Sequence, residues 1–440
     1  MKAVHDANSL SASASNAQKP RNRQQARKAR RRQSMVSSHA VNKLVGLLIA
    51  ASVRDSNEFC MNSTHALFAS GANIPSAACS VLMPVALAGD LWPGLNSSAP
   101  RSLSIHGKRL YFAAEIHSTG VELWSCGMAQ PLTSCSMLDE LLPGPPSSIP
   151  DGLVSTPSGL YFAANDELLG RELWMCDDRT VCKVVADIFK GSASSYPSDI
   201  LRLNSCLYFA ADDGFQGREI WKLDPNEHGM PALVHDIMPG LMGSSPVQMQ
   251  AVRTGVVFSA DDGVHGRELW NCDADDTCGL IADACPGECN GDPGGLVEFN
   301  DNLYFRANSG RGIELWICSA WWVCQQLTDA HESKGSNPTG MTPFGQSLYF
   351  AARNDAKGTE LWSCAGATSL CLPAADIWPG ENSSNPHGFS VVGQTLFFVA
   401  NDGIHGEEPW FCPELGKCSM VHDIREGRGS SFPSEMTPLG

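Results

Sequence analysis

One sequence motif recurs along this chain: an apolar run, an acidic turn with glycine, and a strand that ends in tryptophan. Residues 209–221, FAADDGFQGREIW, show the whole motif. Its tryptophans follow one another at intervals of 46 to 50 residues, at Trp124, Trp174, Trp221, Trp270, Trp316, Trp362 and Trp410. A repeat of this length is one supersecondary unit that buries its apolar faces only against its neighbours. The repeat, rather than separate domains, therefore accounts for most of the 440 residues.

Each full unit predicts four short β-strands, as at 199–204, 206–212, 218–221 and 232–237. The second run, CLYFAAD at 206–212, is apolar without alternation, which indicates that both of its faces are buried. Stacked blades bury both faces of a sheet, whereas a two-layer sandwich leaves one face in water. The sequence thus predicts an all-β fold, a β-propeller of four-stranded blades.

Eight blades are favoured, with seven as the alternative. Residues 65–90 align as a worn copy of the unit, that is, a degenerate repeat in which Ala77 takes the tryptophan position. This copy supplies three strands, and residues 433–440 supply the opening strand of a unit. We expect the N- and C-terminal strands to share one blade and close the ring, because closure removes exposed strand edges. The predicted propeller spans residues 65–440.

The N-terminal part has a different composition. Residues 1–34 are a basic segment, and residues 1–40 contain nine Lys and Arg with Asp6 as the sole acid. Residues 35–52 add a short apolar run and small residues, which predicts a signal peptide or signal anchor, followed by a linker at 53–64. The apolar run is shorter than the roughly 20 residues that span a bilayer. A solvated basic tail ahead of a buried strand is the alternative.

The rest of the chain is acidic, with 22 Lys and Arg against 46 Asp and Glu and a formal net charge near −24. Such a body repels phosphate backbones, so we expect no nucleic-acid partner. Membrane association is expected only if the N-terminal apolar segment is retained as an anchor. The predicted location is otherwise secreted or at the extracellular surface.

Cysteine spacing favours an oxidising compartment. Six repeat tryptophans are followed two residues later by a cysteine, and a second cysteine stands six to nine residues further on. Because each pair flanks a short turn between predicted strands, cross-strand pairing places the sulfurs within bonding range. The predicted hairpin disulfides are Cys126–Cys135, Cys176–Cys182, Cys272–Cys278, Cys318–Cys324, Cys364–Cys371 and Cys412–Cys418. Zinc is the competing interpretation, but the pairs lack a consistent second pair or histidine partner.

Two further pairings and three sequons fit the same compartment. Cys285 and Cys289 can close a small loop, and Cys60 can pair with Cys79, which leaves Cys206 as the odd thiol. The sequons predict glycosylation at Asn62, Asn96 and Asn382.

The tryptophan strands resemble a known repeat. GRELWMCDD at 170–178, GREIWKLD at 217–224 and GRELWNCDA at 266–274 are similar to the ELWxxDGT repeat family. The resemblance covers roughly residues 65–440 and implies a secreted or surface repeat protein of propeller type, a class mostly without an assigned activity. This sequence departs from the family at the Asp-Gly-Thr turn, where cysteine-flanked loops stand instead. Properties tied to that turn are therefore not carried over.

A glutamate stands two residues before each repeat tryptophan, at Glu122, Glu172, Glu219, Glu268, Glu314, Glu360 and Glu408. Because a group present in every unit is more typical of structure than of catalysis, we interpret these glutamates as acceptors of backbone N–H groups from the Asp-Gly turn. An aspartate thirteen to fifteen residues after each tryptophan, with the Ser-Ser that follows in most units, suits turn capping.

Alternate turns of a four-stranded blade emerge on one face, so the turns between second and third strands should share a face with the loops after the fourth strands. Carboxylate oxygens of these turns suit Ca²⁺ as the one candidate cofactor, although the spacing matches no complete calcium loop. The candidate ligands are Asp212, Asp213, Asp261, Asp262 and Asp402. His265 and His405 in the same turns are interpreted as surface residues.

Two function classes remain. No G-x-S-x-G, H-E-x-x-H or Walker loop is present, and we assign no catalytic residue. The favoured function is a non-catalytic recognition or adhesion module that uses a broad loop face for protein or glycan partners. The alternative is an extracellular propeller hydrolase or lyase acting on polysaccharide, which needs unrepeated acids or histidines that converge. Trp321 and Trp322 are candidates for carbohydrate stacking, with a cover over the core as the alternative.

Overall fold

The structure is a computed structural model that describes residue 91 and residues 98–433, apart from internal stretches at 128–134, 139–140, 143, 145, 227–228, 320–321, 328–334, 366–369 and 414–416. The chain divides into two compact units, Met1–Gly46 and Leu47–Gly440, and the described residues belong to the second. In this part of the chain, 28 strands form seven sheets and there is no helix. Among the described residues, accordingly, no helix has the length and apolar character needed to cross a membrane.

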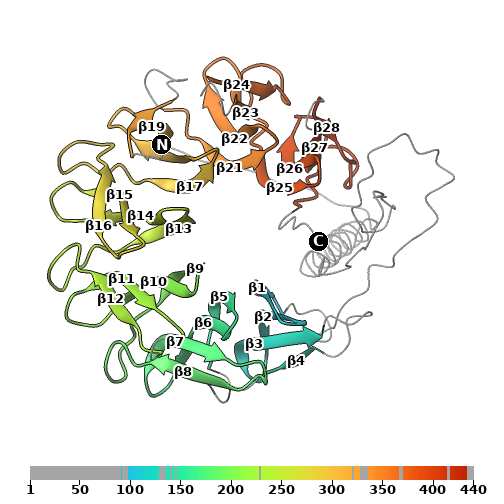
Figure 1. The fold of residues 1–440 in the computed structure, drawn as a ribbon. Coiled ribbons are helices and arrows are strands. Elements are labelled where there is room, and N and C mark those ends of the chain that lie inside the picture. The colour runs from blue at the N-terminus through green and yellow to red at the C-terminus, as the bar shows by residue number, and fades with distance from the viewer. Residues whose placement is uncertain are drawn as a thin grey trace, which may run out of the picture. The chain divides into compact units, whose positions relative to one another are not determined.

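Each sheet is an antiparallel meander of four strands consecutive in the chain, and we number the sheets 1 to 7 in chain order (Figure 1). Sheets 1 to 4 contain β1 (Arg101–His106), β2 (Arg109–Ile116), β3 (Gly120–Gly127), β4 (Cys135–Met137), β5 (Asp151–Thr156), β6 (Gly159–Asp166), β7 (Gly170–Cys176), β8 (Cys182–Ala186), β9 (Ser198–Leu203), β10 (Cys206–Asp212), β11 (Arg218–Leu223), β12 (Ala232–His235), β13 (Val247–Val252), β14 (Gly255–Asp261), β15 (Arg267–Asp273) and β16 (Cys278–Ala282). Sheets 5 to 7 contain β17 (Gly294–Phe299), β18 (Asn302–Asn308), β19 (Ile313–Cys318), β20 (Cys324–Gln326), β21 (Thr339–Phe344), β22 (Ser347–Asn354), β23 (Gly358–Ala365), β24 (Leu370–Ala375), β25 (His387–Val392), β26 (Thr395–Asn401), β27 (Glu407–Pro413) and β28 (Ser419–Met420).

The second and third strands pair in the same register in every sheet. The phenylalanine of the apolar run lies opposite the repeat tryptophan in all seven, as Phe162 lies opposite Trp174. Most of β6 is buried, and Phe162 has no exposed surface. A strand that is covered on both faces has no polar side to alternate with, which explains the continuous apolar run. The prediction of two buried faces is confirmed.

The core residues lie between sheets. Tyr111 and Leu123 of sheet 1 pack with Leu160, Phe162 and Trp174 of sheet 2 in one cluster, and each later pair of consecutive sheets shares a cluster in the same way. The first strands of consecutive sheets also contact one another, from β1 with β5 to β21 with β25. Figure 1 shows these first strands on the inner side of the series. Four-stranded sheets stacked face to face in this way form a β-propeller fold.

The hairpin disulfides predicted from the Trp-x-Cys spacing are all present, and the two Cα atoms of each pair are 4.0 to 4.1 Å apart. Cys285 and Cys289 are joined within the loop that follows β16. Cys206 in β10 is the free cysteine of the described residues, and its sheet 3 lacks a hairpin disulfide because Leu223 replaces the first cysteine.

Several predictions concern residues outside the described part. These are the basic segment, the signal and the linker, the worn unit at 65–90 and all but the first residue of the closing strand at 433–440. The eighth blade, its closure, the Cys60–Cys79 pair and the sequons at Asn62 and Asn96 depend on them. The described part shows seven sheets, each made of its own consecutive strands.

Candidate functional site

The seven repeat glutamates lie near the start of the third strands and are 0 to 3% exposed. Each accepts hydrogen bonds from the loop that follows the fourth strand of its sheet. Glu172 accepts the Ile188 N–H at 3.0 Å, the Ser195 N–H at 2.9 Å and the Ser195 hydroxyl at 2.6 Å. The other glutamate–serine pairs are Glu122–Ser148, Glu219–Ser244, Glu314–Ser336, Glu360–Ser384 and Glu408–Ser431. A buried carboxylate needs such partners.

The prediction that the Asp-Gly turn donates these bonds was wrong, because the aspartates of the turn accept the N–H groups of the turn itself. Asp213 Oδ1 accepts the N–H groups of Phe215 and Gln216, both at 2.9 Å, and Asp212 Oδ1 accepts that of Gly214 at 2.7 Å. Side-chain acceptors of this kind are usual for aspartate in turns. The glutamates therefore bind the neighbouring loop instead.

The five candidate calcium ligands make these turn bonds in three different sheets. Asp261, Asp262 and Asp402 accept N–H groups of their own turns, as Asp212 and Asp213 do. The structure does not bring the five carboxylates together. Within the described residues, no group of three or more His, Cys, Asp or Glu side chains could hold a metal ion.

In five of the six glutamate–serine pairs, the serine also joins its sheet to the next one. The Ser195 carbonyl accepts the N–H of Asp212, at the end of the second strand of sheet 3, at 2.9 Å. Equivalent bonds join Asn165 to Ser148, Asp261 to Ser244, Arg353 to Ser336 and Asn401 to Ser384. Ser195 is thus held by Glu172 from one sheet and by Asp212 from the next. This link was not predicted, although the repeated Ser-Ser was its sequence signal.

Sheet 4 departs from the pattern. Gly291 replaces the serine, so Glu268 accepts N–H groups from Ala284, Cys285 and Gly291 and no hydroxyl. Burial raises the pKa of Glu268 to about 7. Burial also raises the pKa of Glu172, Glu219, Glu360 and Glu408, where a serine hydroxyl partly offsets it.

The turns between second and third strands pack directly on the loops that follow the fourth strands. A Cβ atom on Gly217 would lie 2.5 Å from the Gly243 nitrogen, and Gly217 has a φ of +70°, so glycine is required there. Gly170, Gly266 and Gly358 abut backbone atoms of their loops in the same way. The two kinds of loop therefore emerge at the same end of the sheets, as predicted. We call this end the loop face.

Exposed apolar side chains gather on the loop face. Ten of the 17 large apolar side chains that are exposed in the described residues lie there, against three at the opposite end of the sheets. The ten are Ile149, Leu168, Tyr196, Phe215, Leu241, Met242, Val264, Ile404, Ile424 and Phe432. Such an uneven distribution between the two ends is typical of an interaction surface at the richer end.

Four of these side chains occupy one repeated position, two residues before the turn glycine. Leu168, Phe215, Val264 and Ile404 are 78, 75, 63 and 63% exposed. Their own N–H groups donate to the aspartate of the turn at 2.9 Å in each case. We call them the tip residues. The turn carboxylates thus hold an apolar tip in a fixed position toward solvent.

The histidines of the turns pair with the turn aspartates. His265 Nδ1 lies 2.7 Å from Asp262 Oδ2, and His405 Nδ1 lies 2.7 Å from Asp402 Oδ2. These hydrogen bonds raise the pKa of both histidines, with further contributions from Asp283 and Asp423 in the adjoining loops. In sheet 6 the same position holds a lysine, Lys357, whose ammonium lies 3.1 Å from Asp376 of the adjoining loop.

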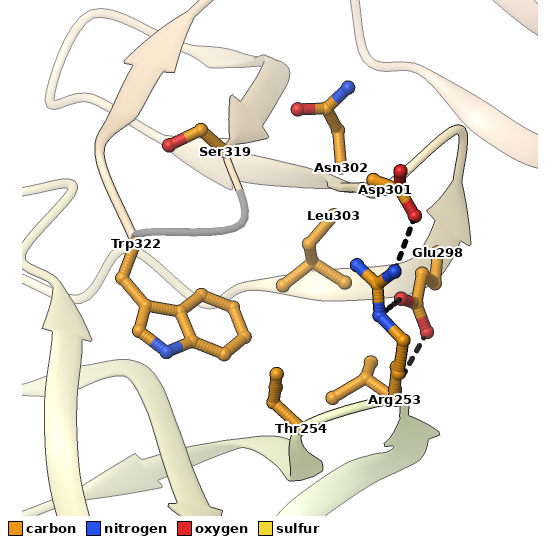
Figure 2. Close-up of a pocket in the computed structure, with 9 residues that line it drawn as sticks. Arg253, Thr254, Glu298, Asp301, Asn302, Leu303, Ser319 and Trp322 are labelled. Carbon is orange, nitrogen blue, oxygen red and sulfur yellow. Dashed lines mark hydrogen bonds and ion pairs between the residues drawn. The ribbon is translucent and has the colours of Figure 1, made fainter.

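At the opposite end, a cavity of about 20 Å³ lies between sheets 4 and 5. Figure 2 shows Arg253 between Asp301 and Glu298 on one side of Leu303, with Trp322 on the other. Arg253 Nη1 lies 2.7 Å from Asp301 Oδ1. The cavity has room for about one water molecule, and Trp322 packs against the core of these sheets. This favours a cover over the core for Trp322, while Trp321 lies outside the described residues.

One serine, histidine and aspartate meet between sheets 1 and 2. His106 is buried, its Nδ1 lies 2.9 Å from Ser155 Oγ, and its Nε2 lies 2.9 Å from Asp178 Oδ1. The Asp178 side chain is 82% exposed. A carboxylate in water holds an imidazole weakly, so the contact is best explained as a link between two sheets.

Comparison with known proteins finds distant structural similarity alone. No protein-family model and no curated protein matches the chain. Among solved structures, the computationally designed protein Ika8 is similar over 76% of this chain and 90% of its own, with 13% identity and a TM-score of 0.45. The β-propeller domain of the trilobed protease from Pyrococcus furiosus matches over 75% of this chain and all of its own, with 10% identity and a TM-score of 0.41.

A prolyl endopeptidase structure matches over 74% of this chain, with 10% identity and a TM-score of 0.47. The matched region is 49% of that chain.

Proposed function

We propose that this protein is a secreted or cell-surface recognition module that binds protein or glycan partners, without catalysis, through the loop face. The observation that supports it is the gathering of exposed apolar side chains at that end of the sheets. A concentration of exposed apolar side chains at one end of a fold is typical of an interaction site. Rigid scaffolds that present loops at one end are a common basis for recognition.

The described hydrogen bonds favour binding over chemistry. The repeated glutamates are buried and accept bonds from their own loops, so they are not available to a substrate. The turn aspartates accept backbone N–H groups, which serves turn geometry. The disulfides in six of the seven sheets are consistent with an extracellular location, where thiols pair and persist.

A binding screen with paired surface variants tests the proposal. Full-length protein, oxidised, is applied to protein and glycan arrays, and each hit is repeated with Leu168→Glu and Met242→Glu on the loop face. Met230→Glu and Val323→Glu at the opposite end are the matched controls, since both side chains are exposed. We expect the loop-face changes to remove binding and the controls to keep it. Binding that is lost in the control variants but kept in the loop-face variants would contradict the use of the loop face.

The hydrolase alternative has one specific contact in its favour, that of His106 with Ser155 and Asp178. A panel of polysaccharide and ester substrates, with Ser155→Ala beside the unchanged protein, examines it directly. We expect no turnover by either protein. Turnover that Ser155→Ala abolishes would replace the binding proposal with an enzyme.

A further inference from the structure

We propose that the partner of the loop face is a cationic amphipathic segment of another protein, a chain that presents apolar side chains flanked by lysine or arginine. This rests on the proposed function and narrows it to one class of partner. The inference depends on the charge of the loop face, on its apolar tips and on the contrast with the opposite end of the same sheets.

The loop face is strongly acidic. Its described turns and loops contain fourteen Asp and Glu against five Lys and Arg, whereas the turns at the opposite end contain six against four. The acidity of the body is therefore concentrated where the exposed apolar side chains are. Charge of one sign on a recognition face attracts partners of the opposite sign and repels others.

In the four turns that contain tip residues, an aspartate stands two residues before each tip. In sheet 3, Phe215 is 75% exposed and follows Asp213 by two residues, and Leu241 and Met242 of the adjoining loop are 74 and 78% exposed. The carboxylate of Asp213 accepts a hydrogen bond from the Phe215 N–H, which fixes the position of the acid relative to the tip. The binding free energy is most favourable for a partner that places apolar side chains over the tips and cations over the turn carboxylates.

This pattern disfavours three other occupants. An anionic lipid surface or a nucleic acid would be repelled by the excess of carboxylates. A small ligand such as a sugar needs a concave site with placed polar groups that fix its orientation, whereas the tip residues are exposed aliphatic or phenyl groups at four separate turns. Preformed tips also lower the entropy lost on binding, which favours a segment that lies across several turns.

The test uses synthetic peptides and the full-length oxidised protein. A labelled Lys–Leu amphipathic peptide is titrated beside a Glu–Leu peptide of the same pattern and a Lys–Ser peptide of the same charge. Only the Lys–Leu peptide should bind, and its affinity should fall about tenfold between low and physiological salt, because exposed charges are screened. Equal binding by the Glu–Leu peptide or the Lys–Ser peptide would overturn the inference.

Paired variants locate the site. Phe215→Ser with Val264→Ser should weaken the Lys–Leu peptide about tenfold or more, since buried apolar contacts dominate interface energies. Val181→Ser with Val323→Ser, exposed at the opposite end, should leave it unchanged. Neutralising the exposed acids Glu167, Glu288 and Glu381 to glutamine should weaken binding, whereas Asp275→Asn should not.

The outcomes separate this inference from the proposed function. If the loop-face variants abolish a glycan hit from the array while the Lys–Leu peptide fails to bind, the recognition function stands and the cationic partner is wrong. Binding to zwitterionic lipid vesicles that Phe215→Ser removes would replace the peptide with a membrane. A peptide affinity that no loop-face variant alters would refute both the site and the partner.

Discussion

Replacing Glu172 with alanine is the sharpest test of what holds neighbouring sheets together. The side chain is fully buried and accepts three hydrogen bonds from Ile188 and Ser195. In the alanine variant two N–H groups and one hydroxyl lose their acceptor, and each unsatisfied buried donor costs about 1–3 kcal/mol. The variant no longer buries a carboxylate, which offsets part of that cost. We therefore expect the free energy of unfolding to fall by about 3–5 kcal/mol.

The measurement is urea unfolding of the full-length protein with its disulfides intact, followed by amide hydrogen exchange. Glu167→Ala is the matched control, because Glu167 is exposed in the preceding turn of the same sheet, and such a change should stay within about 0.5 kcal/mol. The amide of Asp212, in the next sheet, donates to the Ser195 carbonyl and should exchange faster only in the Glu172 variant. Equal effects of both changes, or a loss below about 1 kcal/mol for Glu172→Ala, would refute this account.

Four further outcomes follow from the structure. Burial raises the pKa of Glu268 from 4.5 to about 7, so its contribution to stability is complete below pH 4.5 and is lost as the pH rises through 7. In the Glu268→Gln variant, the free energy of unfolding should lack this dependence on pH. Replacing Cys176 and Cys182 with serine should cost about 2 kcal/mol by denaturant midpoint. A thiol count on the denatured, unreduced chain should find one free cysteine, Cys206, when Cys60 and Cys79 pair as the sequence predicts. NMR titration should place the pKa of His265 above its usual 6.5, since its hydrogen bond to Asp262 raises it, and Asp262→Asn should lower it. Chelator should leave the melting temperature unchanged, whereas a drop that calcium restores would revive the metal site.

Local patterns in the sequence were enough for the architecture of the described part. The interval between tryptophans and the apolar run before each one predicted four-stranded sheets stacked on both faces, and the sheets have that form. The cysteine pairs were predictable because their sulfurs meet across a short turn, where sequence spacing and spatial distance agree. The same logic predicted that alternate turns share a face.

Contacts over longer separations were not predictable in this way. The partner of Glu172 stands 23 residues away in the chain, and the turn five residues before it looked like the nearer donor. The aspartates of the turn were a local signal that it satisfies its own N–H groups, but nothing local identifies the loop that donates to the glutamate instead. His106 meets Ser155 and Asp178 at separations of 49 and 72 residues. Such contacts depend on how one sheet stacks on the next, which a single unit does not encode.

Sheet 4 departs from the glutamate–serine pattern in the loop after its fourth strand. Gly291 gives Glu268 an N–H but no hydroxyl, and a Cβ there would lie 2.5 Å from the carboxylate, so a serine would require the Glu268 side chain to shift. The loop that contains Gly291 has a disulfide of its own, between Cys285 and Cys289, and the Cys285 N–H also donates to Glu268. We infer that the disulfide replaces the missing hydroxyl as the constraint on this loop. Opening it should therefore loosen the loop beside the Val264 tip, while the glutamate–serine loops of the other sheets keep their protection from exchange.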